Sequence, residues 1–412
     1  MKVDIEEVSK TKRVFKIEVP SDVIAKEFSD AYNELRKRVK VPGFRPGKAP
    51  LTLLERRYGR EVETDLIKRL VPDYYLKAVK ESDVTPVDMP EIDNVDLKKG
   101  GVLTFTATVE IKPKIDQVVY EGIELKKEDI IVTEKDVDDR IRELRELNAQ
   151  LEVSKEGDVV EEGDYVQVDY SGFKDGNPVK GLEREGIPIQ LGSGSVNPEI
   201  EKGLIGARIG EEREIQAPEQ NLLLKIKVVE LKKKVLPEIN DDLARDIGGY
   251  NSIAELREKV KEDIMDEKRE AQKADHKKEI IKKLIEWNPV EAPSSLIEKE
   301  MKRFLYRTKR FMGKKGEFEP EEEKALRGKY MPHAEEEVKG DLLVMTIGER
   351  EGISATEDDV EDEIKRMAQK SQQEVWKVKR SLESMDEGLG GLRAKIMDDK
   401  VIKFIMEKAK WI

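Results

Sequence analysis

The pattern of apolar and polar positions at the start of the chain predicts a strand followed by two helices. Residues 13–20 (Arg-Val-Phe-Lys-Ile-Glu-Val-Pro) alternate in polarity, as a strand with one buried face does. Apolar residues then recur at helical spacing from Ile24 to Val39, and Ser21 is in the position of an N-cap. Pro42 and Gly43 are expected to end this helix.

A second helical region is predicted after Pro50, and Pro72 is expected to split or kink it. Residues 104–112 alternate again and predict a closing strand. Residues 116–150 predict a short strand and a charged helix that opens at Thr133 with a capping-box-like sequence. A similar helix opening recurs at Thr356.

The spacing of apolar residues changes from helical to alternating in the middle of the chain. Val166, Val168 and Tyr170 alternate, Asp175-Gly176 is a turn signal, and residues 187–191 and 222–231 predict further strands. From residue 237 onward nearly every segment has helical periodicity. The signals that punctuate this region are a capping box at Ser252, a break at Asn288-Pro289, a helix start at Ser294 or Ser295, a hinge candidate at Gly313–Gly316 and a connector at Gly388–Gly391.

These patterns predict a multidomain α+β chain with four parts. They are an α+β domain at 1–115, a connector strand and helix at 116–150, an inserted β-rich domain at 151–236, and an elongated all-helical domain at 237–412. Composition agrees, because 40% of the residues are charged, against about 25% in typical soluble domains. Thin cores in an extended helical molecule would explain this, although a thermophilic origin would also raise the Glu and Lys content.

Several classes of protein are excluded or disfavoured by the residues that the chain lacks. It has no cysteine, which excludes disulfides, thiol catalysis and Cys-ligated metals. The charged N-terminus does not resemble a signal peptide, and no run approaches the ~20 apolar residues of a membrane span. His276 and His333 are not in a metal-ligand spacing, and no hydrolase or dinucleotide motif occurs. We therefore expect a cytoplasmic protein without a membrane, cofactor or metal site.

One segment is strongly basic, although the whole chain has a net charge of −12. Residues 36–60 contain nine Lys or Arg and a single acid, Glu55, which gives a local charge of +8. Within this segment, residues 41–50 (Val-Pro-Gly-Phe-Arg-Pro-Gly-Lys-Ala-Pro) predict a protruding loop with Phe44 near its tip. An exposed aromatic ring between cations suits contact with RNA phosphates and an acidic side chain.

This loop resembles the ribosome-binding signature of the trigger factor family, bacterial chaperones that meet nascent chains at the exit tunnel. The resemblance extends over the whole chain in domain order. It implies docking on the rim of the large ribosomal subunit, on ribosomal protein and rRNA, through Gly43, Phe44, Arg45, Pro46, Gly47 and Lys48. Pro46 replaces a frequent Lys of the family, and Lys48 and Arg38 are nearby cations that compensate. Homodimerisation away from the ribosome is a family property that the residues themselves do not predict.

A second resemblance, to the FKBP fold, lies in the β-rich domain. Residues 163–172 resemble its first strand, and Leu191–Gly194 and Gly203–Gly206 match later loops. The resemblance implies a prolyl isomerase pocket formed by Tyr170, Phe173, Ile187, Val196, Asn197 and Ile200. Asn197 and Ile200 depart from the usual apolar and aromatic positions, and the flap after Ala217-Pro218 is short. We therefore expect weak or absent isomerase activity.

The family resemblance also implies ATP-independent binding of nascent and unfolded polypeptides by the helical domain. The candidate client-binding residues are Phe304, Leu305, Phe311, Met312, Leu342, Leu343 and Met345. Two alternatives stay open: a stand-alone FKBP-type isomerase whose helices serve dimerisation, and a secreted helical folding factor. The basic loop argues against the first alternative, and the missing signal peptide argues against the second.

Overall fold

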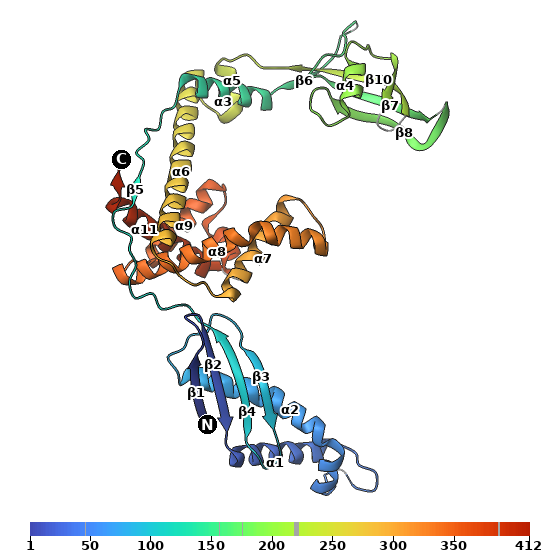
Figure 1. Cartoon of the computed structure of the whole chain (residues 1–412). Coiled ribbons are helices and arrows are strands. Elements are labelled where there is room, and N and C mark those ends of the chain that lie inside the picture. The colour runs from blue at the N-terminus through green and yellow to red at the C-terminus, as the bar shows by residue number, and fades with distance from the viewer. Residues whose placement is uncertain (46, 156, 175, 218–221, 386–387) are drawn as a thin grey trace. The chain divides into compact units, whose positions relative to one another are not determined.

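The computed structural model describes residues 1–412 except 46, 156, 175, 218–221 and 386–387 (Figure 1). It divides into two compact units. Unit 1 comprises residues 1–127 and 274–412, and unit 2 comprises residues 128–273. Among the described residues, no helix is long and apolar enough to cross a bilayer.

The N-terminal part of unit 1 is an antiparallel sheet with two helices on one face (Figure 1). Its strands, in their order across the sheet, are β1 (Lys2–Glu7), β2 (Lys12–Val19), β4 (Leu103–Glu110) and β3 (Glu91–Leu97). Helices α1 (Ser21–Arg38) and α2 (Leu51–Lys80) cover the face on which Phe15, Ile17 and Phe105 are buried. Strand β4 is buried at every second residue, so its alternation of apolar and polar residues sorts the two faces.

The predicted strand at 13–20 is confirmed as β2, and the closing strand as β4. One helix detail was wrong. Pro20, not Ser21, is the N-cap of α1, and no side chain caps that helix. Pro72 lies inside a continuous α2, which it does not split. β1 and β3 were not predicted.

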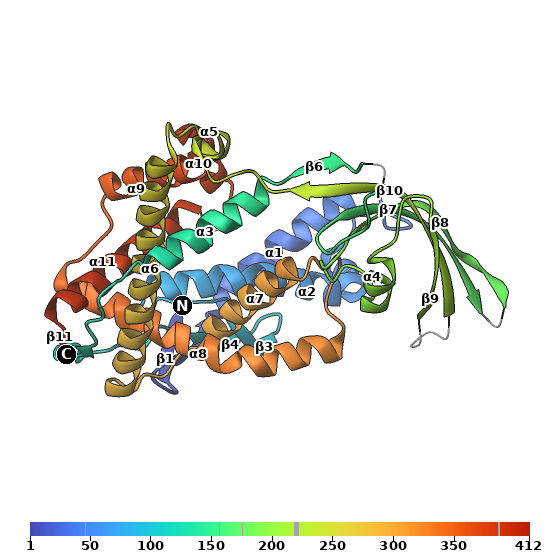
Figure 2. The same ribbon diagram turned by 90° about the horizontal axis from the view of Figure 1, so that it is seen from above.

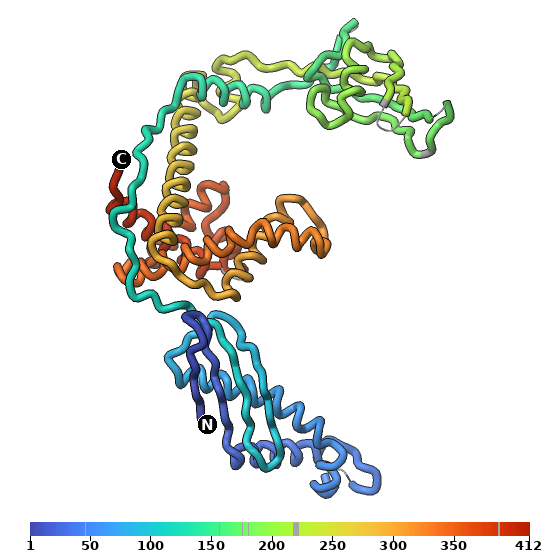
Figure 3. The backbone as a smooth tube through the Cα atoms, viewed as in Figure 1, coloured from blue at the N-terminus to red at the C-terminus, as the bar shows by residue number. Residues whose placement is uncertain are grey.

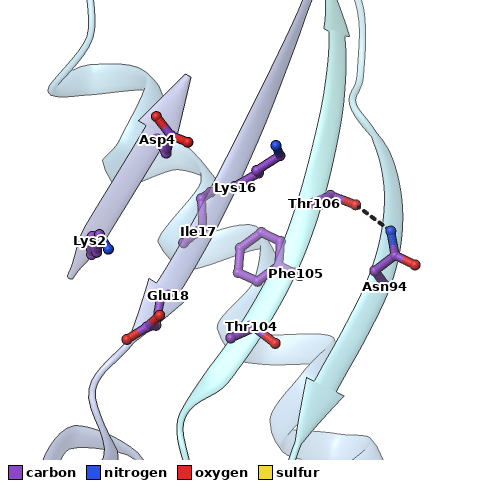
Figure 4. Close-up of a pocket in the computed structure, with 9 residues that line it drawn as sticks. All are labelled: Lys2, Asp4, Lys16, Ile17, Glu18, Asn94, Thr104, Phe105 and Thr106. Carbon is purple, nitrogen blue, oxygen red and sulfur yellow. Dashed lines mark hydrogen bonds between the residues drawn. The ribbon is translucent and has the colours of Figure 1, made fainter. Parts of the chain in front are cut away.

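The face of the sheet away from the helices is polar and carries a shallow pocket of about 330 Å³ (Figure 4). Asn94, in the left-handed region at φ 52°, donates a hydrogen bond to Thr106 Oγ1 (3.2 Å), beside an irregularity in the pairing of β3 with β4. Lys16, on the same face, pairs with Glu6 (2.7 Å). Because these polar groups bond to one another, we assign no ligand to the pocket.

Unit 2 contains a curved antiparallel sheet, and Figure 2 shows β7, β8 and β10 side by side. Its elements are β6 (Gln150–Val153), β7 (Tyr165–Lys174), β8 (Asn177–Gln190), α4 (Pro198–Leu204), β9 (Glu212–Ala217) and β10 (Leu222–Val235). Helix α4 packs against β9 at Gly203, where a Cβ atom would lie 2.5 Å from Ile215 Cδ1. A side chain at residue 203 would therefore push the helix off the sheet.

The rest of unit 2 is a small helical cluster. Helices α3 (Glu134–Leu147) and α5 (Asp241–Gly248) pack with the first half of α6 (Ile253–Trp287) through Ile141, Ala244 and Val260. The capping box predicted at Thr133 is confirmed: its side chain accepts a hydrogen bond from Asp136 N, and the Asp136 side chain accepts one from Thr133 N.

The remaining helices belong to unit 1, and we call residues 274–412 the helical body. The helical body contains the second half of α6 together with five complete helices: α7 (Ser294–Phe311), α8 (Pro320–Glu351), α9 (Glu357–Lys370), α10 (Val375–Glu383) and α11 (Gly388–Lys408). The capping box at Thr356 is confirmed. The connector predicted at Gly388–Gly391 was wrong, because these residues form the first turn of α11.

One hydrophobic core joins the connector to the helical body. Val118, Tyr120, Ile123 and Leu125 from the connector pack against α6, α8 and α11. Next to this core, β5 (Glu124–Leu125) pairs in parallel with β11 (Lys410–Trp411), and Figure 3 shows the C-terminal end of the tube beside the connector. Residues far apart in sequence therefore share one apolar interior.

Asn288 fixes the connector at the edge of this core. It is buried, and its Oδ1 accepts a hydrogen bond from Val119 N (2.7 Å). Its Nδ2 donates to Val119 O (2.8 Å) and Leu284 O (2.8 Å). A single buried amide thus bonds both backbone groups of Val119.

We expect Asn288→Ala to lower the free energy of unfolding of the helical body by about 1–3 kcal/mol, because it removes the hydrogen bonds that tie α6 to the connector at Val119. All three tryptophans, Trp287, Trp376 and Trp411, lie in this body, so urea unfolding followed by tryptophan fluorescence reports on it. Gln373→Ala, at an exposed position, is the control. Equal stability of the two variants would contradict the role of Asn288.

Two carboxyl groups at the junction of α8 and α11 are held in surroundings that disfavour their charge. Desolvation, together with the negative charges of Asp398 and Glu300, raises the pKa of Asp341 to about 6. Desolvation also raises the pKa of Asp398 to about 6, against the opposing charge of Lys277. Because the folded-state values lie above the ordinary value of 3.8, ionisation of these groups destabilises the fold above about pH 6. That destabilisation disappears as the pH falls toward the unfolded value.

Asp341→Asn should therefore stabilise the helical body at about pH 7.5 and have little effect at about pH 4.5. Urea unfolding of the variant and the parent at both pH values measures this difference. Glu349→Gln, at another exposed position of the same helix, removes one charge outside the junction with α11 and serves as the control. An effect of Asp341→Asn that does not change with pH would refute the assignment.

Candidate functional sites

The loop between α1 and α2 is anchored at both ends and exposed in the middle. Val41 and Ala49 are buried in the core of the N-terminal sheet and helices. Gly47 N donates a hydrogen bond to Arg36 O (3.1 Å), and Phe44 N donates to Val41 O (3.1 Å). Gly43 and Gly47 have φ values of 86° and 80°, which side chains rarely adopt. The backbone therefore folds into a fixed loop rather than a free one.

This geometry presents an aromatic ring to solvent. The Phe44 side chain is 42% exposed, and Arg45 and Lys48 beside it are exposed as well. Pro46, the departure from the family pattern, lies outside the described residues.

The cations around the loop are largely without acidic partners. Arg38 pairs with Glu34 (3.7 Å), and the only acid of the segment, Glu55, pairs with Lys99 (2.5 Å). Within the described part of the chain, no ion pair engages the other basic residues of 36–60, which are Arg36, Lys37, Lys40, Arg45, Lys48, Arg56, Arg57 and Arg60. The exposed ring therefore lies in a field of positive charge that is available to an anionic partner.

Four of the six residues predicted for the isomerase pocket lie in unit 2 on the core side of the curved sheet and α4. Tyr170, Ile187, Val196 and Ile200 are partly buried and pack against one hydrophobic core. Phe173 is half-buried, with Lys225 Nζ 5.6 Å from the centre of its ring. The flap at residues 218–221 lies outside the described residues.

Asn197 has a structural role that the sequence did not indicate. It is the N-cap of α4, and its Oδ1 accepts a hydrogen bond from Glu199 N (2.9 Å). The polar side chain is therefore used to begin the helix. Ile200 follows in the first turn, so an aliphatic group occupies the place where the family resemblance leads us to expect an aromatic one.

The structure separates the predicted client-binding residues into buried and exposed sets. Leu305 is buried in the core of the α7–α8 hairpin, and Leu342 and Leu343 are buried in the helical body. Phe304 is partly buried and stacks on Tyr330, with ring centres 5.5 Å apart. Met345 is half-buried. Only Phe311 and Met312, at the end of α7, are strongly exposed.

Other exposed apolar residues were missed. Tyr306 on α7 and Val375 and Trp376 on α10 are all exposed, as is Met385 just after α10. Trp376 could have been found from sequence, because basic residues follow it directly. Phe311, which was predicted, likewise lies next to basic residues, which in its case precede it. Helical spacing alone does not say which apolar face is covered.

Three family models match the chain. The model described as "Bacterial trigger factor protein (TF)" covers residues 1–144, and its C-terminal counterpart covers residues 252–407. Between them, the model of the FKBP-type peptidyl-prolyl cis-trans isomerase covers residues 157–221. The order of the three matched models along the chain agrees with the domain order inferred from the motifs.

Similar proteins match over nearly the full length. The trigger factor of Geobacter sulfurreducens is 32% identical, with 98% of this chain and 97% of the relative covered. The trigger factor of Bacillus licheniformis is 33% identical over 99% of this chain and 100% of the relative. That of Anoxybacillus flavithermus is 34% identical over 96% of each.

A solved structure has the same fold at low sequence identity. It is described as "Promiscuous Substrate Recognition in Folding and Assembly Activities of the Trigger Factor Chaperone" and aligns with a TM-score of 0.53 and 23% identity over 99% of both chains. Taken with the family models and the full-length relatives, the chain belongs to the trigger factor family of chaperones and carries an FKBP-type peptidyl-prolyl cis-trans isomerase domain.

Proposed function

We propose that this chain is a cytoplasmic, ribosome-associated chaperone that binds nascent and unfolded polypeptides without ATP. The observation that carries the proposal is the exposed Phe44 on an anchored loop between unpaired cations. Ribosomal RNA supplies phosphates for Arg45 and Lys48, and a ribosomal protein at the exit-tunnel rim supplies an acidic and apolar surface. Gly43 and Gly47 hold the loop in a shape that few other residues adopt.

The four domains proposed from sequence divide this work. Residues 1–115 dock, 116–150 connect, 151–236 carry the isomerase fold, and 237–412 hold clients. Client binding needs apolar surface that the fold leaves uncovered. Phe311 and Met312 from the predicted set meet this requirement, whereas Leu305, Leu342 and Leu343 serve the core. We therefore place the client surface on the exposed ends of α7 and α10.

The docking proposal is tested by co-sedimentation with ribosomes. We expect the double variant Phe44→Ala/Arg45→Ala to lose co-sedimentation, because it removes both the apolar contact and a phosphate ligand. Suppression of aggregation in the absence of ribosomes should be largely unchanged. The matched control is Lys80→Ala/Met89→Ala, which removes an exposed cation and an exposed apolar side chain elsewhere in the same domain. Retained sedimentation of the loop variant would contradict docking through this loop.

We also infer that isomerase activity is weak. The amide barrier of roughly 18–20 kcal/mol is lowered in a dry apolar pocket that favours the twisted, less polar amide. Here the aromatic side chains of the predicted pocket are Tyr170 and Phe173. Asn197 is committed to capping α4, and Ile200 provides less apolar surface than an aromatic ring.

A refolding assay limited by proline isomerisation measures this activity. We expect the full chain to be at least about tenfold slower per molecule than an ordinary FKBP, a difference of about 1.4 kcal/mol in barrier height. Ile200→Phe should raise the rate, because it restores an aromatic floor, whereas Tyr170→Ala should lower it. Turnover equal to that of an ordinary FKBP would overturn the inference.

A further inference from the structure

Helix α7 begins without a capping side chain of its own. Its N-cap residue is Pro293, which accepts no side-chain hydrogen bond, although the first N–H groups of a helix have no partner within the helix. The missing acceptor comes from the N-terminal sheet. Glu110, the last residue of β4, accepts hydrogen bonds from Ser295 N through Oε2 (2.7 Å) and from Ser294 Oγ through Oε1. It therefore caps a helix that starts 184 residues further along the chain.

The surroundings of Glu110 favour its charged form. Its side chain is 13% exposed, and Lys12 Nζ on the neighbouring strand β2 lies 3.6 Å from Oε1. Burial alone would raise the pKa of this carboxyl group, but the hydrogen bonds from Ser294 and Ser295 and the charge of Lys12 outweigh burial, so the pKa is lowered. The positive end of the helix dipole of α7 also favours an anion at this position. Glu110 is thus held as a carboxylate between β2 and the first turn of α7.

Other contacts at this junction are polar as well. We call residues 1–112 the N-terminal lobe. Besides the contacts of Glu110, side chains of the lobe and of the helical body are joined by three hydrogen bonds. They run from Thr11 Oγ1 to Glu291 Oε1 (3.4 Å), from Lys299 Nζ to Val87 O (3.4 Å) and from Lys112 Nζ to Met345 Sδ (3.2 Å).

The N-terminal lobe and the helical body have separate hydrophobic cores. Among the described residues, no apolar cluster contains side chains from both. A cleft of about 640 Å³ lies between them, lined by Ser9 and Lys10 of the lobe and by Pro289 and Lys339 of the body, among others. Because separation would open no apolar core, the lobe can leave the body while each stays folded.

We propose that Glu110 is a releasable latch, which holds the N-terminal lobe in one orientation on the helical body by capping α7. When the latch opens, the lobe turns about residues 112–117, which form no helix or strand, and the first turn of α7 loses its cap. Opening costs only a few polar contacts, so it belongs to the low-energy motions of a folded chain. The inference goes beyond the proposed function, because it concerns the orientation of the lobe and not what either part binds.

The test measures the orientation of the lobe by the distance between two spin labels. The chain has no cysteine, so Lys68→Cys on α2 and Lys403→Cys on α11, both exposed, provide the only labelling sites. We expect one narrow main distribution of distances in the labelled parent. Glu110→Ala should raise the population outside this main distribution about fivefold, which corresponds to the loss of a typical helix cap.

Two further variants serve as controls. Glu18→Ala removes an exposed carboxylate from β2 of the same sheet and should leave the distribution unchanged. Glu110→Gln keeps an acceptor for Ser295 N but loses the charge, so its released population should lie between those of the parent and Glu110→Ala. Because glutamine has nearly the shape of glutamate, this variant also supplies the measurement if Glu110→Ala does not fold.

Hydrogen exchange of the same full-length variants shows where the protein opens. In Glu110→Ala, the amides of residues 295–297 should exchange about fivefold faster than in the parent, because the first turn of α7 has lost its cap. The amides of β2 and of α8 should keep the protection that they have in the parent.

Three results would overturn the inference. Faster exchange at residues 295–297 with an unchanged distance distribution would mean that Glu110 caps α7 without setting the orientation of the lobe. A parent distribution as broad as that of Glu110→Ala would mean that no latch holds the lobe. Loss of protection throughout β2 in both Glu110 variants would mean that the lobe does not stay folded without its contact with the body.

Discussion

The structure of unit 1 depends on one shared core between the connector and the helical body. Val118, Ile123 and Leu125 have no core of their own, since they come from an extended segment whose regular structure is a two-residue strand. They are buried because α6, α8 and α11 supply the opposite surface. Asn288 and the pairing of β5 with β11 satisfy the polar backbone that this burial would otherwise leave without partners.

The projecting elements share a second constraint, which is a buried anchor next to an exposed aromatic ring. Val41 and Ala49 anchor the loop that exposes Phe44, and Phe318 anchors the loop that exposes Phe311. In both loops glycines at positive φ allow the sharp reversals, at Gly43 and Gly47 and at Gly313 and Gly316. Such anchoring lowers the entropy that is lost when a partner binds.

Local signals allowed much of the fold to be predicted from sequence. Strand β2, the capping boxes at Thr133 and Thr356 and the helix break at Asn288 depend on neighbouring residues only. Strands β1 and β3 were missed because they lie at the sheet edges and are rich in charge, so their alternation is weak. Pro72 alone did not decide between a split and a continuous helix, and the structure shows that α2 continues through it.

The candidate site residues could likewise be predicted where the signal is local and not where it depends on tertiary packing. The exposed basic loop at residues 41–50 was recognisable because Gly, Pro and charge are local properties of sequence. Leu342 and Phe311 look alike in a helical pattern, and only tertiary packing shows that one is covered and the other is not. Asn197 was read as a pocket residue because the family resemblance was given more weight than the local signal of a helix start, which is Pro198 directly after it.

The parallel pairing of β5 with β11 also determines the order in which the protein can fold during its own synthesis. The N-terminal sheet and its helices are complete once β4 has been made, so they can fold early. The connector must remain without its core until α11 and β11 have emerged. Between these two moments its apolar residues are unprotected. A member of a chaperone family thus itself passes through a stage of synthesis in which part of its core is still open.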